Sequence, residues 1–89
     1  MKAVITVLGR DTVGILAKVA TVCADCNVNI EEVTQSILGG VFAMIMVVDV
    51  SRASLEFGAL QEKLAAAGEE KGVEVKMTRQ ELYETMHHI

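Results

Sequence analysis

The sequence predicts an α+β fold, a two-layer sandwich of four strands and two helices in the order βαββαβ. Three observations support this fold class. Short apolar runs of strand length alternate with segments whose apolar residues recur at helical spacing. The pair Gly39-Gly40 separates two of these runs and is typical of a tight hairpin turn. The chain of 89 residues has no proline and no linker, so we expect a single domain over residues 1–89.

The first strand and first helix account for the N-terminal third of the chain. The strand is expected over Lys2–Leu8, where both faces are mostly apolar. The helix follows over about Gly14–Cys26, and Asn27 is expected to end it because asparagine tolerates the left-handed conformation. The side of this helix that faces the core is expected to comprise six residues, namely Ile15, Leu16, Val19, Ala20, Cys23 and Cys26.

The next two strands differ strongly in polarity. The strand expected over Asn29–Leu38 is the most polar of the four, which suits the edge of a sheet or a surface that faces a ligand. The strand expected over Val41–Val50 is apolar on both faces for most of its length. That pattern is typical of a central strand.

The C-terminal half repeats the order of helix and strand. Ser54 is expected to cap a helix over Leu55–Lys71, and Gly72 to end it. The residues of Val73–Arg79 alternate between apolar and polar, as in a half-buried strand. Residues 80–89 form an expected helical extension. Its apolar face would comprise Leu82, Tyr83 and Met86.

Right-handed crossovers arrange these elements as a ferredoxin-like sandwich. The strands would lie antiparallel in the spatial order 4-1-3-2, with both helices on one face of the sheet. The other face would keep apolar residues from the first and third strands, and an uncovered apolar face normally marks an interface. A hydrophobic content of 52% is high for so small a domain and supports the same conclusion. We therefore expect a homodimer, formed either face to face or through the edges of the second strands.

Composition limits the classes of partner. The net charge of −4 argues against non-specific binding of nucleic acid, which requires a basic surface. The sequence contains no apolar run of the length that crosses a membrane and no pattern typical of a signal peptide. We therefore expect a cytoplasmic protein without a membrane partner, whose two cysteines stay reduced.

The stretch from Gly9 to Leu16 forms the turn from the first strand into the first helix. Such a turn exposes unpaired N–H groups at the positive end of a helix dipole, where a carboxylate or phosphate can bind. Gly14 has no Cβ and would let a ligand approach the backbone closely. The same residues also fit a purely structural role, in which Asp11 or Thr12 caps the helix and Gly9 makes the turn.

Three other kinds of site are weaker fits to the sequence. RNA recognition would need stacking aromatics on the third strand, which has only Phe42. Cys23 and Cys26 have the spacing of a metal or redox pair, but they lie near a helix C-terminus, so we expect two buried core residues and no metal site. Arg10 and Asn29 could imitate the arginine and asparagine of an acylphosphatase, although the phosphate cradle of that family is absent.

The stretch Gly9-Arg10-Asp11-Thr12-Val13-Gly14-Ile15-Leu16, followed about one helix later by Asn27-Val28-Asn29-Ile30, resembles the ACT domain. The resemblance covers about Lys2 to Arg79. It rests on the turn D-x-x-G-I-L and on the asparagine that enters the second strand. Small proteins that consist of a single stand-alone ACT domain are the most similar, and the ACT domains of the glycine-cleavage transcriptional repressor are more distantly similar.

The resemblance implies a regulatory module that binds an amino acid or a similar effector at a homodimer interface. It implies no catalytic activity and no cofactor, and a separate protein would receive the signal. Many members that bind ligands have proline where this sequence has Val13, and some members serve only as dimerisation modules, so a module without a ligand is the alternative. The implied ligand-binding positions are Asp11, Thr12, Val13, Gly14, Ile15 and Asn29.

Overall fold

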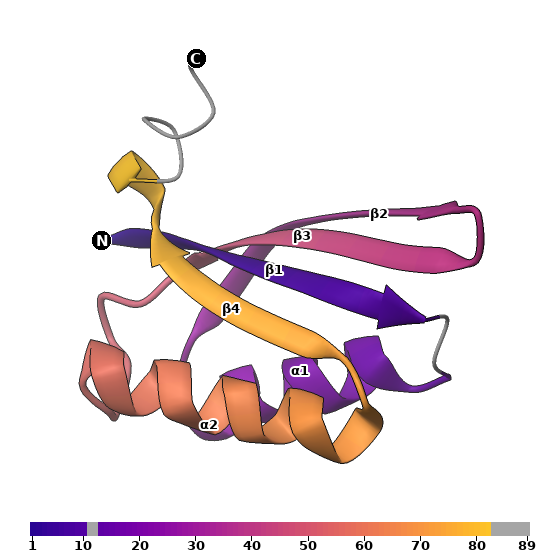
Figure 1. Cartoon of the computed structure of the whole chain (residues 1–89). Coiled ribbons are helices and arrows are strands. Elements are labelled where there is room, and N and C mark those ends of the chain that lie inside the picture. The colour runs from indigo at the N-terminus through magenta and orange to yellow at the C-terminus, as the bar shows by residue number, and fades with distance from the viewer. Residues whose placement is uncertain (11–12, 83–89) are drawn as a thin grey trace.

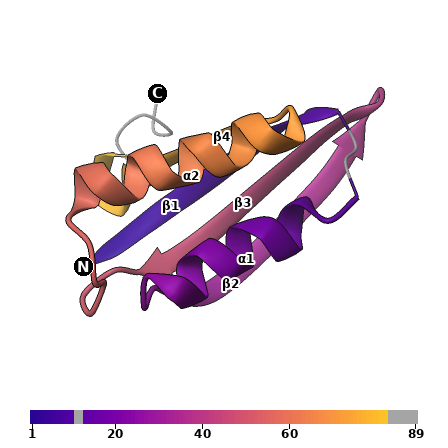
Figure 2. The same ribbon diagram turned by 90° about the horizontal axis from the view of Figure 1, so that it is seen from below.

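A computed structural model, which describes residues 1–10 and 13–82, has the expected order βαββαβ (Figure 1). Its four strands form one antiparallel sheet in the order β2-β3-β1-β4, which confirms the predicted 4-1-3-2 arrangement. Both helices lie on one face of this sheet, α1 beside β2 and α2 beside β4 (Figure 2). The elements are β1 Lys2–Arg10, α1 Ile15–Asp25, β2 Asn29–Leu38, β3 Val41–Asp49, α2 Phe57–Lys71 and β4 Glu74–Arg79, with a short helical turn after β4.

The core fills the space between the sheet and the two helices. In β3, Met44 and Met46 are almost completely buried, whereas Ile45 between them is 38% exposed. The alternation follows from the period of two residues in a strand. Leu60 and Leu64 of α2 meet this buried face of the sheet, since they belong to the same core cluster.

Neither α1 nor α2 lies over the opposite face of the sheet (Figure 1). It carries three large apolar side chains with substantial exposure: Leu8 at 52%, Val41 at 40% and Ile45 at 38%. The central position of β1 and β3 and the apolar character of their uncovered face are therefore as predicted.

Gly9 does not make the turn after the first strand, because β1 continues to Arg10. The structure gives this glycine a different role. A Cβ at Gly9 would lie 2.6 Å from Cγ1 of Val73, closer than any real contact allows. Gly9 is therefore required by the close approach of the chain before β4 to β1.

The buried side of α1 differs from the prediction at Leu16. This side chain is 37% exposed, whereas Val22 is 8% exposed and takes part in the core. The reason is geometric, since Leu16 lies about 100° around the helix from Ile15 and falls on its flank. Asn27 has a φ of 57° just after the helix, as predicted.

The second helix begins at Phe57 rather than at Leu55, and its N-cap is Glu56 rather than Ser54. The N–H of Ser54 instead donates a hydrogen bond of 2.9 Å to the carbonyl of Cys26. This bond holds Ser54 in the loop before the helix, at the end of α1. Gly72 ends the helix with a φ of 72°, as predicted.

The expected C-terminal extension is only partly described. Leu82 is 55% exposed, and Tyr83 and Met86 lie outside the described residues. Over residues 1–10 and 13–82, neither helix combines the length and the apolar character that a membrane span requires.

Candidate functional site

The sequence predicts an anion site at the turn before α1, of which the structure describes Val13 and Gly14. Gly14 is the N-cap residue of α1, with a φ of 85°, and no described side chain caps this helix. The φ value favours glycine because other residues are strained there. The ammonium of Lys71 lies 3.8 Å from the position that a Cβ on Gly14 would occupy, so a positive charge adds to that of the helix N-terminus.

The other predicted residues of this turn are only partly described. Asp11 and Thr12 lie outside the described residues. Val13 is 93% exposed and Ile15 is buried in the core, so Ile15 can contribute only its backbone N–H to a ligand. In this turn, the described groups that a ligand could contact are thus mainly backbone groups around Gly14.

Asn29 lies at the other end of α1. It is the first residue of β2, is exposed, and pairs with Asp49 at the end of β3. The helix between the two sites has 11 residues and a length of about 16 Å, which exceeds the length of any standard amino acid. Within one protomer, the structure therefore does not bring Gly14 and Asn29 together.

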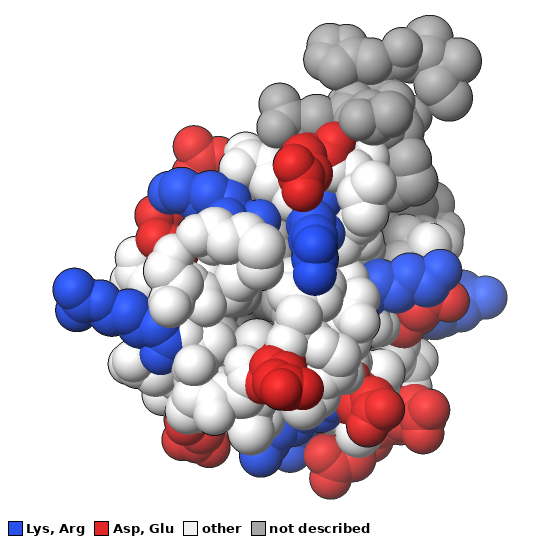
Figure 3. Space-filling model, turned by 90° about the vertical axis from the view of Figure 1, so that its left-hand side faces the viewer, with Lys and Arg blue, Asp and Glu red and all other residues white. Residues whose placement is uncertain are grey.

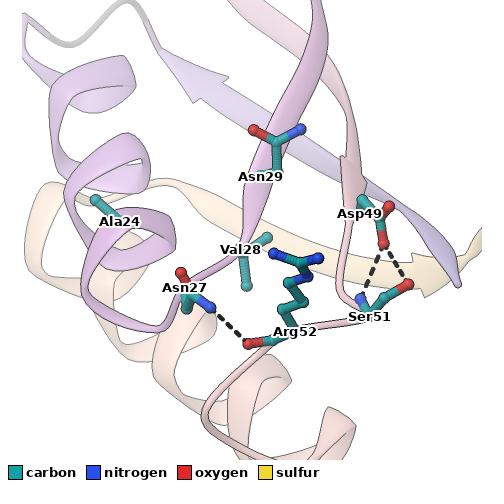
Figure 4. A pocket seen from close by; sticks show the side chains of 7 residues that line it. All are labelled: Ala24, Asn27, Val28, Asn29, Asp49, Ser51 and Arg52. Atoms are coloured by element: carbon teal, nitrogen blue, oxygen red, sulfur yellow. Dashed lines mark hydrogen bonds between the residues drawn. The ribbon is translucent and has the colours of Figure 1, made fainter.

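A pocket of about 520 Å³ lies around Asn29 (Figure 4). Its walls come from two segments, the end of α1 with the start of β2, and the end of β3 with the loop after it. The side chain of Asn27 joins these segments, because its Nδ2 donates a hydrogen bond of 2.8 Å to the carbonyl of Arg52. The lining residues are Ala24, Asn27, Val28, Asn29, Asp49, Ser51 and Arg52.

Asp49 provides a fixed negative charge in this pocket. Its Oδ1 accepts hydrogen bonds from the Ser51 hydroxyl at 2.6 Å and from the Ser51 N–H at 2.9 Å. These bonds, with smaller contributions from the N-terminal ammonium and Lys2, lower the pKa of the Asp49 carboxyl from 3.8 to about 2. The N-terminal ammonium of Met1 lies 3.6 Å from the same oxygen. Asp49 is therefore ionised at neutral pH.

Sequence reasoning identified Asn29 but missed the polar residues that surround it. The sequence pattern places Asp49 inside an apolar strand and gives Ser51 and Arg52 no role in a site. The sequence did contain a clue to these residues. Polar residues at the end of a buried strand lie next to the start of the strand that pairs with it in a hairpin. The hairpin of β2 and β3 brings the end of β3 to the start of β2.

The structure also bears on the alternative sites. Arg10 pairs with Val41 and Asn29 pairs with Asp49, at opposite ends of β3 and about 26 Å apart along it. The pair that an acylphosphatase-like site would need is thus not assembled. Phe42 is 6% exposed on the face under the helices, where it is unavailable for stacking on a base.

The cysteine pair belongs to the core, as predicted. Cys23 and Cys26 are each 2% exposed, and burial, with a smaller contribution from Cys26, raises the pKa of the Cys23 thiol to about 11. The described residues contain no group of three or more potential metal ligands. On the face that Figure 3 views, Lys and Arg side chains lie scattered among Asp and Glu.

Comparison with known proteins shows the family to which this chain belongs. The family model for the ACT domain matches residues 2–78. A UPF0237 protein of Methanopyrus kandleri is 44% identical over 99% of this chain and 98% of its own length. A UPF0237 protein of Listeria monocytogenes is 40% identical over the full length of both chains.

Solved structures agree with this assignment. An ACT domain protein from Streptococcus pneumoniae superposes with a TM-score of 0.82 at 33% identity, over 94% of each chain. A candidate glycine cleavage system transcriptional repressor shares the fold, with a TM-score of 0.75 at 23% identity over 89% of this chain and 45% of that one. The chain therefore belongs to the ACT domain family and, within it, to the UPF0237 proteins.

Proposed function

We propose that this chain is a regulatory module that binds an amino acid or a similar small effector between two copies of itself. It has no catalytic activity of its own and passes the signal to a separate protein. The observation that supports this proposal most strongly is the separation of Gly14 from Asn29 by the length of α1. The two parts of the site can share one small ligand only if they come from different copies.

A pairing along the edges of two β2 strands would assemble such a site. Because β2 is an edge strand of the sheet, its outer backbone groups pair with no other strand of residues 1–10 and 13–82. An antiparallel pairing of two β2 edges about a two-fold axis reverses the direction of the adjacent helix. The Gly14 turn of each copy then approaches the Asn29 end of the other.

Apolar residues along this edge support the same arrangement. Val33 is 41% exposed and Ile37 is 57% exposed, and both pair with β3 residues that point toward the helices. Leu16, on the flank of α1, is 37% exposed. A second copy at the β2 edge would cover these side chains. The free energy gained on dimerisation would increase with the apolar area removed from water.

The chemistry of the assembled site suits a zwitterion. The α-carboxylate would accept hydrogen bonds from the first N–H groups of α1, beside the ammonium of Lys71. The α-ammonium would donate to the amide oxygen of the partner's Asn29 and to the carboxylate of Asp11. A ligand held in this way stabilises one arrangement of the dimer through its differential affinity for that arrangement.

One observation favours a different function. Val13 is an apolar residue in the predicted ligand loop and is 93% exposed. A covering protein would bury this side chain, whereas an amino acid at the helix N-terminus would not need it. The second candidate function is therefore an interaction module without a small-molecule ligand.

A thermal-shift screen against the twenty amino acids separates these functions. An effector at about a hundred times its Kd adds roughly 2.7 kcal/mol, a shift of several degrees in a domain of this size. Asn29→Ala should abolish the shift, and Ser36→Ala, an exposed position on the same strand, should leave it unchanged. A dimer with no response to any amino acid would contradict the ligand-binding function and support the interaction module.

A further inference from the structure

The guanidinium of Arg52 reaches into the pocket, between Asn29 on β2 and Asp49 at the end of β3 (Figure 4). The backbone of this residue is held, because its carbonyl accepts the hydrogen bond from Asn27. The side chain is not held in the same way. Its guanidinium makes neither a hydrogen bond nor an ion pair with any residue in 1–10 or 13–82.

The loop that carries Arg52 is fixed on both sides by backbone hydrogen bonds. The N–H of Val50 donates to the carbonyl of Met1 at 2.9 Å, and the N–H of Ala53 donates to the carbonyl of Val50 at 3.1 Å. The N–H of Ser54 donates to Cys26 at the end of α1. A cation on such a fixed loop loses less freedom on binding an anion than one on a loose loop does.

Asp49 does not neutralise this cation. One of its carboxylate oxygens already accepts two hydrogen bonds from Ser51 and lies 3.6 Å from the N-terminal ammonium. No ion pair joins Asp49 to Arg52 within the described residues. The pocket therefore offers a guanidinium whose five donors remain open to a ligand.

We propose that Arg52 binds a carboxylate in the side chain of the effector, so that the site selects a dicarboxylic amino acid such as glutamate or aspartate. This inference rests on the proposed function, in which the α-carboxylate is held at the N-terminus of α1 of the other copy. Arg52 then provides a second, separate anion site across the pocket. A guanidinium binds a carboxylate through two parallel hydrogen bonds, which an amide cannot match. The pocket of about 520 Å³ has room for a ligand of this size.

Binding measurements with acidic amino acids and their amides test the inference. L-Glutamate and L-aspartate are titrated calorimetrically into the wild-type protein, in parallel with L-glutamine and L-asparagine. We expect at least one acid to bind about tenfold more tightly than its amide, because charge-assisted hydrogen bonds are the stronger ones. Arg52→Gln should remove this preference, and Arg52→Lys should keep part of it.

A matched substitution elsewhere controls for the loss of charge. Arg79→Gln removes an arginine of β4 that lies over the ring of Phe57, outside the pocket, and should leave the preference unchanged. Arg52→Gln should keep the thermal midpoint of the unliganded wild type, because its guanidinium has no partner among the described residues. An unchanged midpoint shows that any loss of binding arises in the site.

The outcomes separate the inference from the function on which it rests. If the amides bind as tightly as the acids, or Arg52→Gln keeps the preference, the inference about Arg52 is wrong while the amino-acid function stands. If no amino acid binds but glutarate binds in an Arg52-dependent way, the carboxylate site stands and the amino-acid function is wrong. If neither amino acids nor glutarate bind, both proposals are wrong.

Discussion

The side-chain amide of Asn27 donates a hydrogen bond of 2.8 Å to the carbonyl oxygen of Arg52. This bond joins the end of α1 to the loop after β3, which together form the pocket around Asn29. Asn27 also occupies the left-handed conformation, with a φ of 57°. A single residue thus ends the first helix and positions the loop that carries Arg52.

Substitution of Asn27 should separate these two roles. Asn27→Gly loses the hydrogen bond, at a cost of about 1 kcal/mol, but tolerates the backbone conformation. Asn27→Ala loses the bond and adds about 1 kcal/mol of backbone strain. Urea denaturation should therefore rank the free energies of unfolding as wild type, then Asn27→Gly, then Asn27→Ala. If the alanine variant is as stable as the glycine variant or more stable, the predicted backbone strain at position 27 is wrong.

Two glycines of α2 should respond in opposite ways to alanine. A Cβ on Gly68 would lie 2.6 Å from Cγ2 of Val75 and 2.7 Å from the carbonyl oxygen of Val73, so Gly68→Ala should destabilise by about 1–3 kcal/mol. A Cβ on Gly58 meets no described atom within 4 Å, so Gly58→Ala should stabilise by about 0.5–1 kcal/mol through helix propensity. Chemical denaturation measures both. Equal effects of the two substitutions would contradict the close packing of α2 on the chain that forms β4.

The carboxyl of Asp49 should contribute to acid sensitivity. Its pKa is lowered to about 2 in the folded protein from an ordinary value of 3.8, chiefly by the hydroxyl and the N–H of Ser51. The stabilisation is therefore complete above about pH 4 and is lost as the pH falls through about 2. An NMR titration of the Asp49 carboxyl should give a midpoint near 2, and Ser51→Ala should raise it. A midpoint of 3.8 in the wild type would show that these hydrogen bonds do not form in solution.

The surface that forms the proposed dimer should be revealed by charge placed on one exposed isoleucine at a time. Ile37 lies on the edge strand β2 and is 57% exposed, whereas Ile45 lies on the open face and is 38% exposed. We expect Ile37→Glu to shift the protein from dimer to monomer in light scattering, because a carboxylate would be desolvated at the interface. Ile45→Glu should leave the dimer intact. The reverse result would support a dimer formed face to face.

Much of the fold could be predicted because local patterns agree with one another. The apolar runs located β1 and β3 at the centre of the sheet, and the pair Gly39-Gly40 located the hairpin, where both residues have positive φ. The end of α1 at Asn27 and the end of α2 at Gly72 followed from the residues that tolerate the left-handed conformation. Each of these features depends on residues close together in the sequence.

Features that depend on distant contacts could not be predicted. The role of Gly9 depends on Val73, and the late start of α2 depends on a bond from Ser54 to Cys26. An irregularity in β2 between Ile30 and Glu32 leaves no residue of β3 opposite Glu31, whose carboxylate contacts the ammonium of Lys2. No local pattern marks this irregularity, since it changes only the register between strands.

The candidate site was predictable only in part for the same reason. The turn at Gly14 has a sequence pattern because its residues are contiguous. The pocket around Asn29 combines two segments that lie far apart in the chain, so its polar residues became visible as one group only in the folded structure. By contrast, the separation of Gly14 and Asn29 within one protomer follows from the length of α1. It could have been derived from the predicted helix.

A mixing experiment tests most directly whether the ligand bridges two copies. Asp11→Ala and Asn29→Ala, each expected to abolish binding alone, are unfolded together, refolded as a mixture, and titrated with the amino acid that stabilises the wild type. If each site combines the loop of one copy with Asn29 of the other, every mixed dimer keeps one intact site, so about a quarter of the wild-type binding capacity should return. If the site lies within one protomer, no mixed dimer contains an intact site, and a mixture with no binding would contradict the account.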